Sequence, residues 1–152
     1  DFGYSNDPTS LVAVYKWNDG YIFDELIYKK GLLNSDISNL FKTNDVKGHI
    51  YADSAEPKSI EELRLRGHQI HPCTKGRDSI LYGIELINQN SIFVTATSYN
   101  LIKELQSYTW QVDKAGEKMN KPIDAHNHAI DAVRYAMTET LRNPHKGEYY
   151  IY

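Results

Sequence analysis

The sequence predicts an α/β fold with a mixed central sheet flanked by helices. Two observations lead to this prediction. Near the start, two apolar, β-branched runs, residues 10–17 and 21–30, are separated by Asn-Asp-Gly, and an Asp-Gly pair favours a tight turn between antiparallel strands. After this hairpin, short apolar runs alternate with segments of helical periodicity, an order that gives parallel strands joined by helices.

The segments that follow the hairpin read as two short helices and two short strands. Residues 36–43 carry apolar side chains at helical spacing, and residues 49–52 form an apolar run that predicts a buried strand. Residues 57–66 begin with a proline, which suits the first turn of a helix, and a glycine follows them. Residues 69–73 predict another short strand.

The second half of the chain repeats this alternation. Residues 78–89 place leucine and isoleucine on one helical stripe, residues 91–95 predict a strand, and residues 100–110 predict a helix. Residues 113–121 are polar and predict a loop or a hairpin tip. A last helix is predicted for residues 124–141, with an aspartate at its start as the N-cap and an alanine-rich buried face.

Length and composition indicate one globular core. The chain has 152 residues, of which 41% are hydrophobic and 24% charged, and both values are ordinary for a single domain. No apolar run approaches the roughly 20 residues of a membrane-spanning helix, and no secretory signal is expected. The one cysteine excludes an internal disulfide and a cysteine-based zinc finger, and fits a reducing compartment. We expect residues 1–142 to form one domain and residues 143–152 a C-terminal tail.

The net charge of −3 is unusual for a domain that holds DNA by itself, because such domains are commonly basic. Two interpretations are open. Either the domain does not bind DNA, or it acts on DNA that a partner presents, while several of its acids form a metal site.

Three acidic residues stand apart from the other acids of the chain. Asp1 begins Asp-Phe-Gly, Asp53 ends a predicted strand, and Asp131 lies on the last predicted helix, three residues after His128 and therefore on the same face. Such acids are costly to bury unless a cation neutralises them. Together they can hold two Mg²⁺ or Mn²⁺ ions, which prefer oxygen ligands and can cleave phosphodiesters as a pair.

Each acid also has an interpretation without a metal. In this interpretation Asp1 is merely the first residue of the sequence, and Asp53 caps the helix that follows. Asp131 pairs with Arg134 or Arg64 on a solvated helix face.

His128 can handle protons near neutral pH. Its alternatives are a solvated helix histidine or a zinc site shared with Asp124, His126 and Asp131. Asp7 lies in an Asn-Asp-Pro turn, where a turn role is expected.

Six basic residues are candidates for contacts with DNA phosphates, although an ordinary solvated surface explains them equally well. Three of them lie on the polar loop before the last helix. The six are Lys58, Lys75, Arg77, Lys114, Lys118 and Lys121.

Four segments carry a family pattern in order: DFGYSNDPTS, YADSAEPKSIEELRLRG, KGRDSILYGIELIN and PIDAHNHAIDAVRYA. They resemble the C-terminal nuclease domain of tailed-phage terminase large subunits, and the resemblance spans residues 1–141. It implies a ribonuclease H-like fold and a metal-dependent endonuclease that cuts concatemeric viral DNA during genome packaging. It also implies metal ligands at Asp1, Asp53 and Asp131, with His128 as an auxiliary catalytic residue.

The resemblance also implies partners and a location. The sequence has no Gly-x-x-x-x-Gly-Lys-Ser/Thr pattern, so the terminase ATPase domain is missing from this chain. Double-stranded DNA, that ATPase domain, the small terminase subunit and the portal are the implied partners, in the host cytoplasm at the viral procapsid. No membrane partner is expected. A motor that holds the domain on DNA would also explain its acidic charge.

Other functions fit the residues less fully. One alternative is a junction resolvase or RNA–DNA hybrid nuclease of the same fold. An actin-like or sugar-kinase relative also begins with Asp-x-Gly but needs a second phosphate loop and a longer chain. A non-catalytic interaction module of the packaging motor is the third. Cleavage assays on several substrates distinguish these possibilities.

Overall fold

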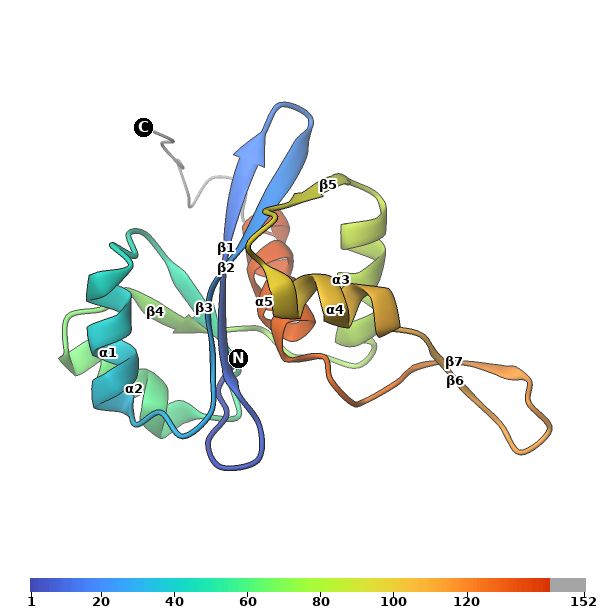
Figure 1. Cartoon of the computed structure of the whole chain (residues 1–152), viewed down its shortest axis with the longest axis horizontal. Coiled ribbons are helices and arrows are strands. Elements are labelled where there is room, and N and C mark those ends of the chain that lie inside the picture. Colours follow the sequence, from blue (N-terminus) through green and yellow to red (C-terminus); the bar gives the residue numbers. More distant parts are fainter. Residues whose placement is uncertain (143–152) are drawn as a thin grey trace.

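The computed structural model describes residues 1–142, so the predicted tail, residues 143–152, lies outside the described residues. The first elements in chain order are β1 (Thr9–Trp17), β2 (Gly20–Lys29), α1 (Asn34–Thr43), β3 (Ile50–Ala52), α2 (Pro57–Leu65) and β4 (Ile70–Pro72) (Figure 1). They are followed by α3 (Ser79–Asn88), β5 (Ser91–Val94), α4 (Tyr99–Ser107), β6 (Trp110–Val112), β7 (Lys118–Pro122) and α5 (His128–Arg142).

The strands confirm the predicted mixed sheet. β1 and β2 pair antiparallel around the turn between Trp17 and Gly20, in which Asn18 adopts a left-handed φ of 49°. β5 joins the other edge of β2 in parallel, and β3 and β4 form a separate parallel pair. α5 packs against β1, β2 and β3, and so links the two groups of strands.

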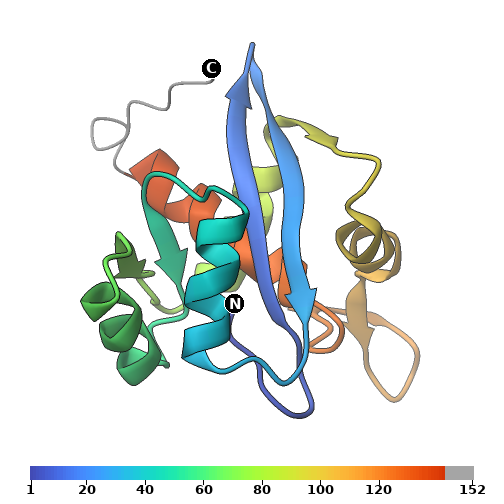
Figure 2. The same cartoon turned by 60° about the vertical axis from the view of Figure 1, so that its left-hand side comes forward.

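Two apolar clusters lie on opposite sides of the β1–β2 hairpin. One contains Phe23 and Val12 of the hairpin together with Val133 and Met137 of α5. The other includes Ile27 and side chains of α1, α2, β3 and β4. Figure 2 shows α1 and α5 on the two sides of the hairpin. The bulge between Leu11 and Val12 shifts the register of β1 and β2.

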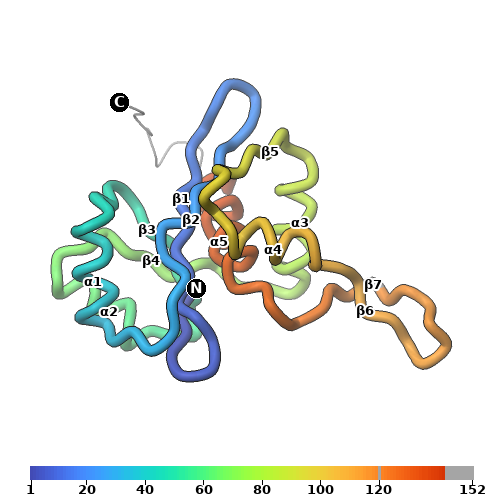
Figure 3. Tube along the Cα trace, viewed as in Figure 1, coloured from blue at the N-terminus to red at the C-terminus, as the bar shows by residue number. Residues whose placement is uncertain are grey.

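Two predicted boundaries near the last helix are wrong. α4 ends at Ser107, and Trp110 instead pairs with Pro122 in the antiparallel β6–β7 hairpin, which projects from the body as an arm (Figures 1 and 3). α5 begins at His128, so Asp124 is not its N-cap. None of the helices within residues 1–142 combines the length and apolarity needed to cross a membrane.

Candidate metal centre

Helix α5 presents one stripe of polar side chains to the ends of the strands. His128, Asp131 and Tyr135 follow each other at spacings of three and four residues, which place them on one face. A buried carboxylate holds the start of this helix: the backbone N–H groups of Ala129 and Ile130 donate to Glu104 Oε2 at 2.8 and 3.0 Å. A carboxylate at a helix N-terminus satisfies unpaired donors and complements the helix dipole.

Asp1 lies against the start of this stripe. Its backbone exchanges two hydrogen bonds of 2.9 Å with Ser10 in β1, which fixes the residue beside the sheet at the centre of the molecule (Figure 3). Gly3 is needed in the loop that follows, because a Cβ there would lie 2.3 Å from the Asp7 carbonyl oxygen. The Asp1 side chain is 3.2 Å from His128, between Oδ2 and Nδ1.

Asp53 follows β3 directly, and its side chain makes three polar contacts. Its Oδ1 accepts a hydrogen bond from the Ala55 backbone N–H at 2.8 Å and lies 2.5 Å from Lys75 Nζ. The Tyr135 hydroxyl donates to Oδ2 at 3.3 Å. Burial by itself would raise the pKa of the Asp53 carboxyl, but the hydrogen bonds and the charge of Lys75 outweigh it and lower the pKa below its usual value. The predicted capping role is wrong, because Glu56 occupies the N-cap position of α2 and the Asp53 side chain makes only a turn contact to Ala55 ahead of the helix.

Asp131 is held by a buried arginine on the same helix. Arg134 donates from Nε at 3.2 Å and from Nη2 at 2.8 Å to one oxygen, Asp131 Oδ1. The Arg134 side chain is only 6% exposed, so the predicted pairing exists, but not on a solvated face. Burial by itself would lower the pKa of the guanidinium, and the adjacent Asp131 charge outweighs it and raises the pKa. Arg64 instead donates to the Ile70 carbonyl at 2.7 Å.

These contacts place the three predicted ligands around one stretch of α5. Asp1 contacts His128, Asp53 contacts Tyr135, and Asp131 lies between those two positions on the helix. The oxygen donors fit the preference of Mg²⁺ and Mn²⁺. As the side chains are placed within residues 1–142, however, no three histidine, cysteine, aspartate or glutamate side chains form a group that can hold a metal. Each of the three carboxylates is turned toward a basic side chain.

The histidines give little support to the zinc alternative. His128 Nε2 lies 3.5 Å from Asp7 Oδ1, so this imidazole stands between Asp1 and Asp7. Asp7 therefore has a contact at the site in addition to its expected turn. His126 is exposed and adopts a left-handed φ of 51° in the loop before α5.

The predicted DNA-contacting residues fall in separate places. Lys75 and Arg77 lie in the loop between β4 and α3, and Lys75 is at the site through Asp53. Lys58 is exposed on α2. The remaining three are exposed on the β6–β7 arm: Lys114, Lys118 and Lys121.

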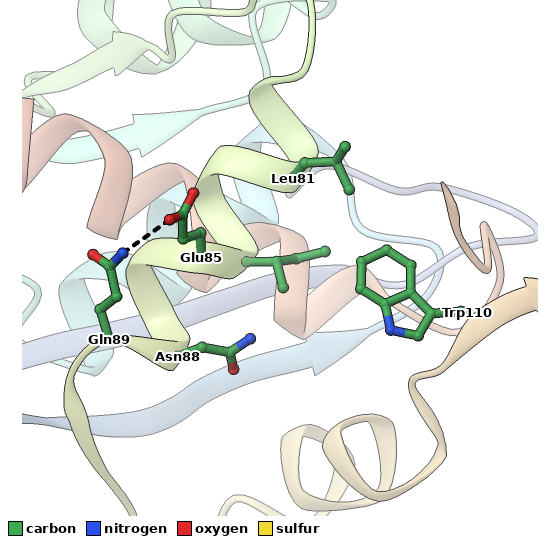
Figure 4. Close-up of a pocket in the computed structure, with 6 residues that line it drawn as sticks. Leu81, Glu85, Asn88, Gln89 and Trp110 are labelled. Carbon is green, nitrogen blue, oxygen red and sulfur yellow. Dashed lines mark hydrogen bonds between the residues drawn. The ribbon is translucent and has the colours of Figure 1, made fainter. Parts of the chain in front are cut away.

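The pocket in Figure 4 is not part of this site. It has a volume of about 330 Å³ and lies between α3 and the arm, lined by Leu81, Ile84 and Trp110 among others. The Gln89 side chain donates to Glu85 at its rim at 2.9 Å. None of the three predicted metal ligands lines it.

Sequence reasoning named Arg134 as a partner of Asp131 but missed two supporting residues. Tyr135 follows Asp131 by four residues, so helical spacing could have identified it as a neighbour of the acids. Glu104 had no such signal, because it reaches the start of α5 from another helix.

Comparison with known proteins identifies the family of the chain. Residues 1–139 match the family model of the terminase RNase H-like domain. The chain is 32% identical over 149 residues to the terminase large subunit of Bacillus phage SPP1, covering 93% of this chain and 35% of that protein. It is 28% identical to the PBSX phage terminase large subunit of Bacillus subtilis, covering 91% of this chain and 33% of that one. The chain thus spans about a third of these relatives.

Solved structures give the same answer. The SPP1 large terminase nuclease domain, crystallised with bound Mn, superposes with a TM-score of 0.81 at 28% identity, covering 91% of this chain and 82% of that one. The large terminase of a thermophilic bacteriophage has a TM-score of 0.73 at 22% identity, over 92% of this chain and 38% of that one, and supports the fold. By sequence and by fold, the chain belongs to the terminase RNase H-like domain family.

Proposed function

We propose that this chain is the nuclease domain of a phage terminase large subunit, and that it hydrolyses double-stranded viral DNA during genome packaging with two divalent metal ions. The observation that supports this most is the arrangement of Asp1, Asp53 and Asp131 along one face of α5. The structurally similar SPP1 nuclease domain, with its bound Mn, supports the use of a divalent metal.

In this proposal the three carboxylates hold Mg²⁺ or Mn²⁺. Such ions supply an activated water and stabilise the leaving oxygen of a phosphodiester. Arg134 fixes Asp131 through one oxygen, and Tyr135 orients Asp53. These contacts restrict the carboxylates to a few orientations before a metal enters, which lowers the entropic cost of binding it.

His128 has the position of a proton-handling residue. Its two nitrogens face the carboxylates of Asp1 and Asp7, and an imidazole between carboxylates can accept a proton and pass it on. Because it contacts a proposed ligand, we assign it the auxiliary catalytic role that the family resemblance implies.

The remaining part of a terminase would hold this acidic domain on DNA. The chain carries a net charge of −3, and its relatives are about three times as long. We propose that the ATPase portion of the same polypeptide holds the domain on DNA, together with the small subunit and the portal, at the procapsid in the host cytoplasm. Tethering replaces intrinsic affinity by effective concentration.

Plasmid digestion tests the proposal. Supercoiled plasmid is incubated with the chain and Mn²⁺, Mg²⁺, Ca²⁺ or EDTA, and Asp53→Asn and Asp131→Asn are compared with the control Asp45→Asn. Asp45 is an exposed acid paired with Lys47 at the surface. We expect Mn²⁺-dependent nicking that both site variants lose and the control keeps. Nicking that survives in either site variant would show that this residue is not a ligand.

The same assay separates the alternative functions. Four-way junctions and RNA–DNA hybrids are digested in parallel with the plain duplex. A clear preference for either substrate would favour the resolvase or hybrid-nuclease alternative. No cleavage of any substrate under any metal would favour a non-catalytic interaction module.

A further inference from the structure

Lys75 is held beside the candidate metal centre by the loop that carries it. The Cys73 N–H donates to the Ala52 carbonyl at 2.7 Å, and the Thr74 N–H donates to Glu139 Oε1 at 2.6 Å. Cys73 and Glu139 are buried. These bonds tie the loop to the end of β3 and to α5, so they hold the backbone that leads into Lys75 in place.

Within residues 1–142, the Lys75 side chain forms the shortest ion pair with any of the three acids. Its Nζ lies 2.5 Å from Asp53 Oδ1, and 5.9 Å from the centre of the Tyr135 ring. Yet 43% of the Lys75 side chain is exposed, against 6% for Arg134. A lysine pairs as a flexible point charge, whereas a buried arginine fork is held in place. Lys75 can therefore leave its carboxylate for water, and Arg134 cannot.

We propose that Lys75 is an exchangeable counter-ion of Asp53. It neutralises Asp53 before a metal binds, gives up the carboxylate when a divalent ion enters, and then contacts a phosphate oxygen of the substrate backbone. This inference rests on the proposed function, since it takes Asp53 as a metal ligand. The ammonium and a divalent ion are both positive and repel each other at the same oxygen, so binding of the ion favours release of the ammonium from Oδ1.

The proposal gives Lys75 two effects of opposite sign. Removing the ammonium removes a competitor for Asp53, so metal affinity should rise by up to about fivefold, the range that a partly exposed ion pair can supply. Removing a phosphate contact should slow cleavage at saturating metal. A residue that only supports the fold would lower both quantities together.

Calorimetric titration with Mn²⁺ and plasmid cleavage test these effects. Lys75→Met removes the charge and Lys75→Arg keeps it. The matched control, Lys47→Met, removes a lysine from an ion pair of 2.7 Å with Asp45, with both side chains more than 70% exposed. We expect tighter Mn²⁺ binding with slower cleavage for Lys75→Met, near wild-type values for Lys75→Arg, and no change in the control.

Other results would overturn the proposal. Unchanged or weaker Mn²⁺ binding in Lys75→Met would show that the lysine does not compete with metal. Tighter binding with unchanged or faster cleavage would show that it contacts no phosphate in the reaction. A Mn²⁺ titration of Asp53→Asn distinguishes failure of the proposed function from failure of the exchange alone. If the variant binds Mn²⁺ as well as the wild type does, Asp53 is not a metal ligand, and the basis for the exchange is lost with it.

Discussion

Substituting Gly83 by alanine should disturb the support beneath Asp131. Gly83 lies buried on α3 where that helix packs against α5. A Cβ at this position would lie 2.1 Å from Cγ and 2.6 Å from Cδ of Arg134. These atoms are in the middle of a buried side chain whose guanidinium is bound to Asp131, so the arginine cannot move without weakening that contact.

The change in the free energy of unfolding of Gly83→Ala follows from two opposing effects. Overpacking a core position typically costs ~1–3 kcal/mol, and alanine is favoured over glycine in a helix by ~1 kcal/mol. Because a displaced Arg134 also loses part of its hydrogen bonding to Asp131, we expect a net loss of about 1–2 kcal/mol in the free energy of unfolding. The measurement is urea unfolding in EDTA, followed by circular dichroism.

A double-mutant cycle isolates the cause. Arg134→Ala removes Cγ and Cδ, so Gly83→Ala in that background should be neutral or stabilising by ~0.5–1 kcal/mol through helix propensity. The coupling between the two sites should then be about 2 kcal/mol. Additivity within ~0.5 kcal/mol would refute the reasoning and show that Gly83 is not needed to seat Arg134.

Three further outcomes are expected. Glu104→Gln should lower the free energy of unfolding by about 1.5–3 kcal/mol, because a buried charge bonds the start of α5; an unchanged urea midpoint would contradict this. His128→Ala should slow Mn²⁺-dependent nicking by ~10²–10⁴-fold while Mn²⁺ still binds in calorimetry; loss of all binding would make the histidine a ligand. Burial and the charges of Lys42 and Arg66 lower the pKa of His68, so the unfolded state takes up a proton first, and stability should fall as pH drops below about 6.5. Urea midpoints of His68→Gln should fall less between pH 7 and 5 than those of the wild type, and equal falls would exclude His68 as a cause.

The parts of the fold that local chemistry determines were predicted from the sequence. The Asn-Asp-Gly segment predicted the β1–β2 hairpin, although the left-handed residue of the turn is Asn18 and not the Asp-Gly pair. Apolar runs predicted β3, β4 and β5. The end of α4 was missed because no glycine or proline separates the helix from Trp110. Only the pairing of Trp110 with Pro122 selects the strand. Asp124 was a sound local N-cap signal, but Glu104 occupies that role from a distant part of the sequence.

The acids of the candidate site were predictable from local sequence patterns, but the basic partner of Asp53 was not. Acids at strand ends and at helical spacing pointed to Asp1, Asp53 and Asp131. The bases that the acids contact were harder to identify: Lys75 reaches Asp53 only because β3 and β4 run in parallel and end side by side. Which carboxylate would have a buried partner and which an exposed one is a property of packing, and no pattern in the sequence reports it.

That difference in burial leads to unequal consequences of removing the acids. Asp131→Ala would leave the Arg134 guanidinium, only 6% exposed, without its carboxylate, and an uncompensated buried charge is costly. We expect the free energy of unfolding in EDTA to fall by roughly 2–4 kcal/mol. This loss is somewhat smaller than is usual for a buried pair, because Asp131 itself is 20% exposed. Asp53→Ala releases an exposed lysine and relieves repulsion among the acids, so its unfolding free energy should stay within ~1 kcal/mol of the wild type.

Urea unfolding of both variants in EDTA measures this asymmetry, with Asp45→Ala as the surface control. Arg134→Met in the Asp131→Ala background should restore most of the lost stability, because it removes the unpaired charge and keeps the aliphatic volume. Equal urea midpoints for Asp53→Ala and Asp131→Ala would show that water reaches Arg134 freely and that the arginine does not hold Asp131 in a fixed position. If the asymmetry is found, loss of nicking in Asp131→Ala reports partly on folding. Asp131→Asn, which retains an oxygen for Arg134, is then the variant that isolates metal binding.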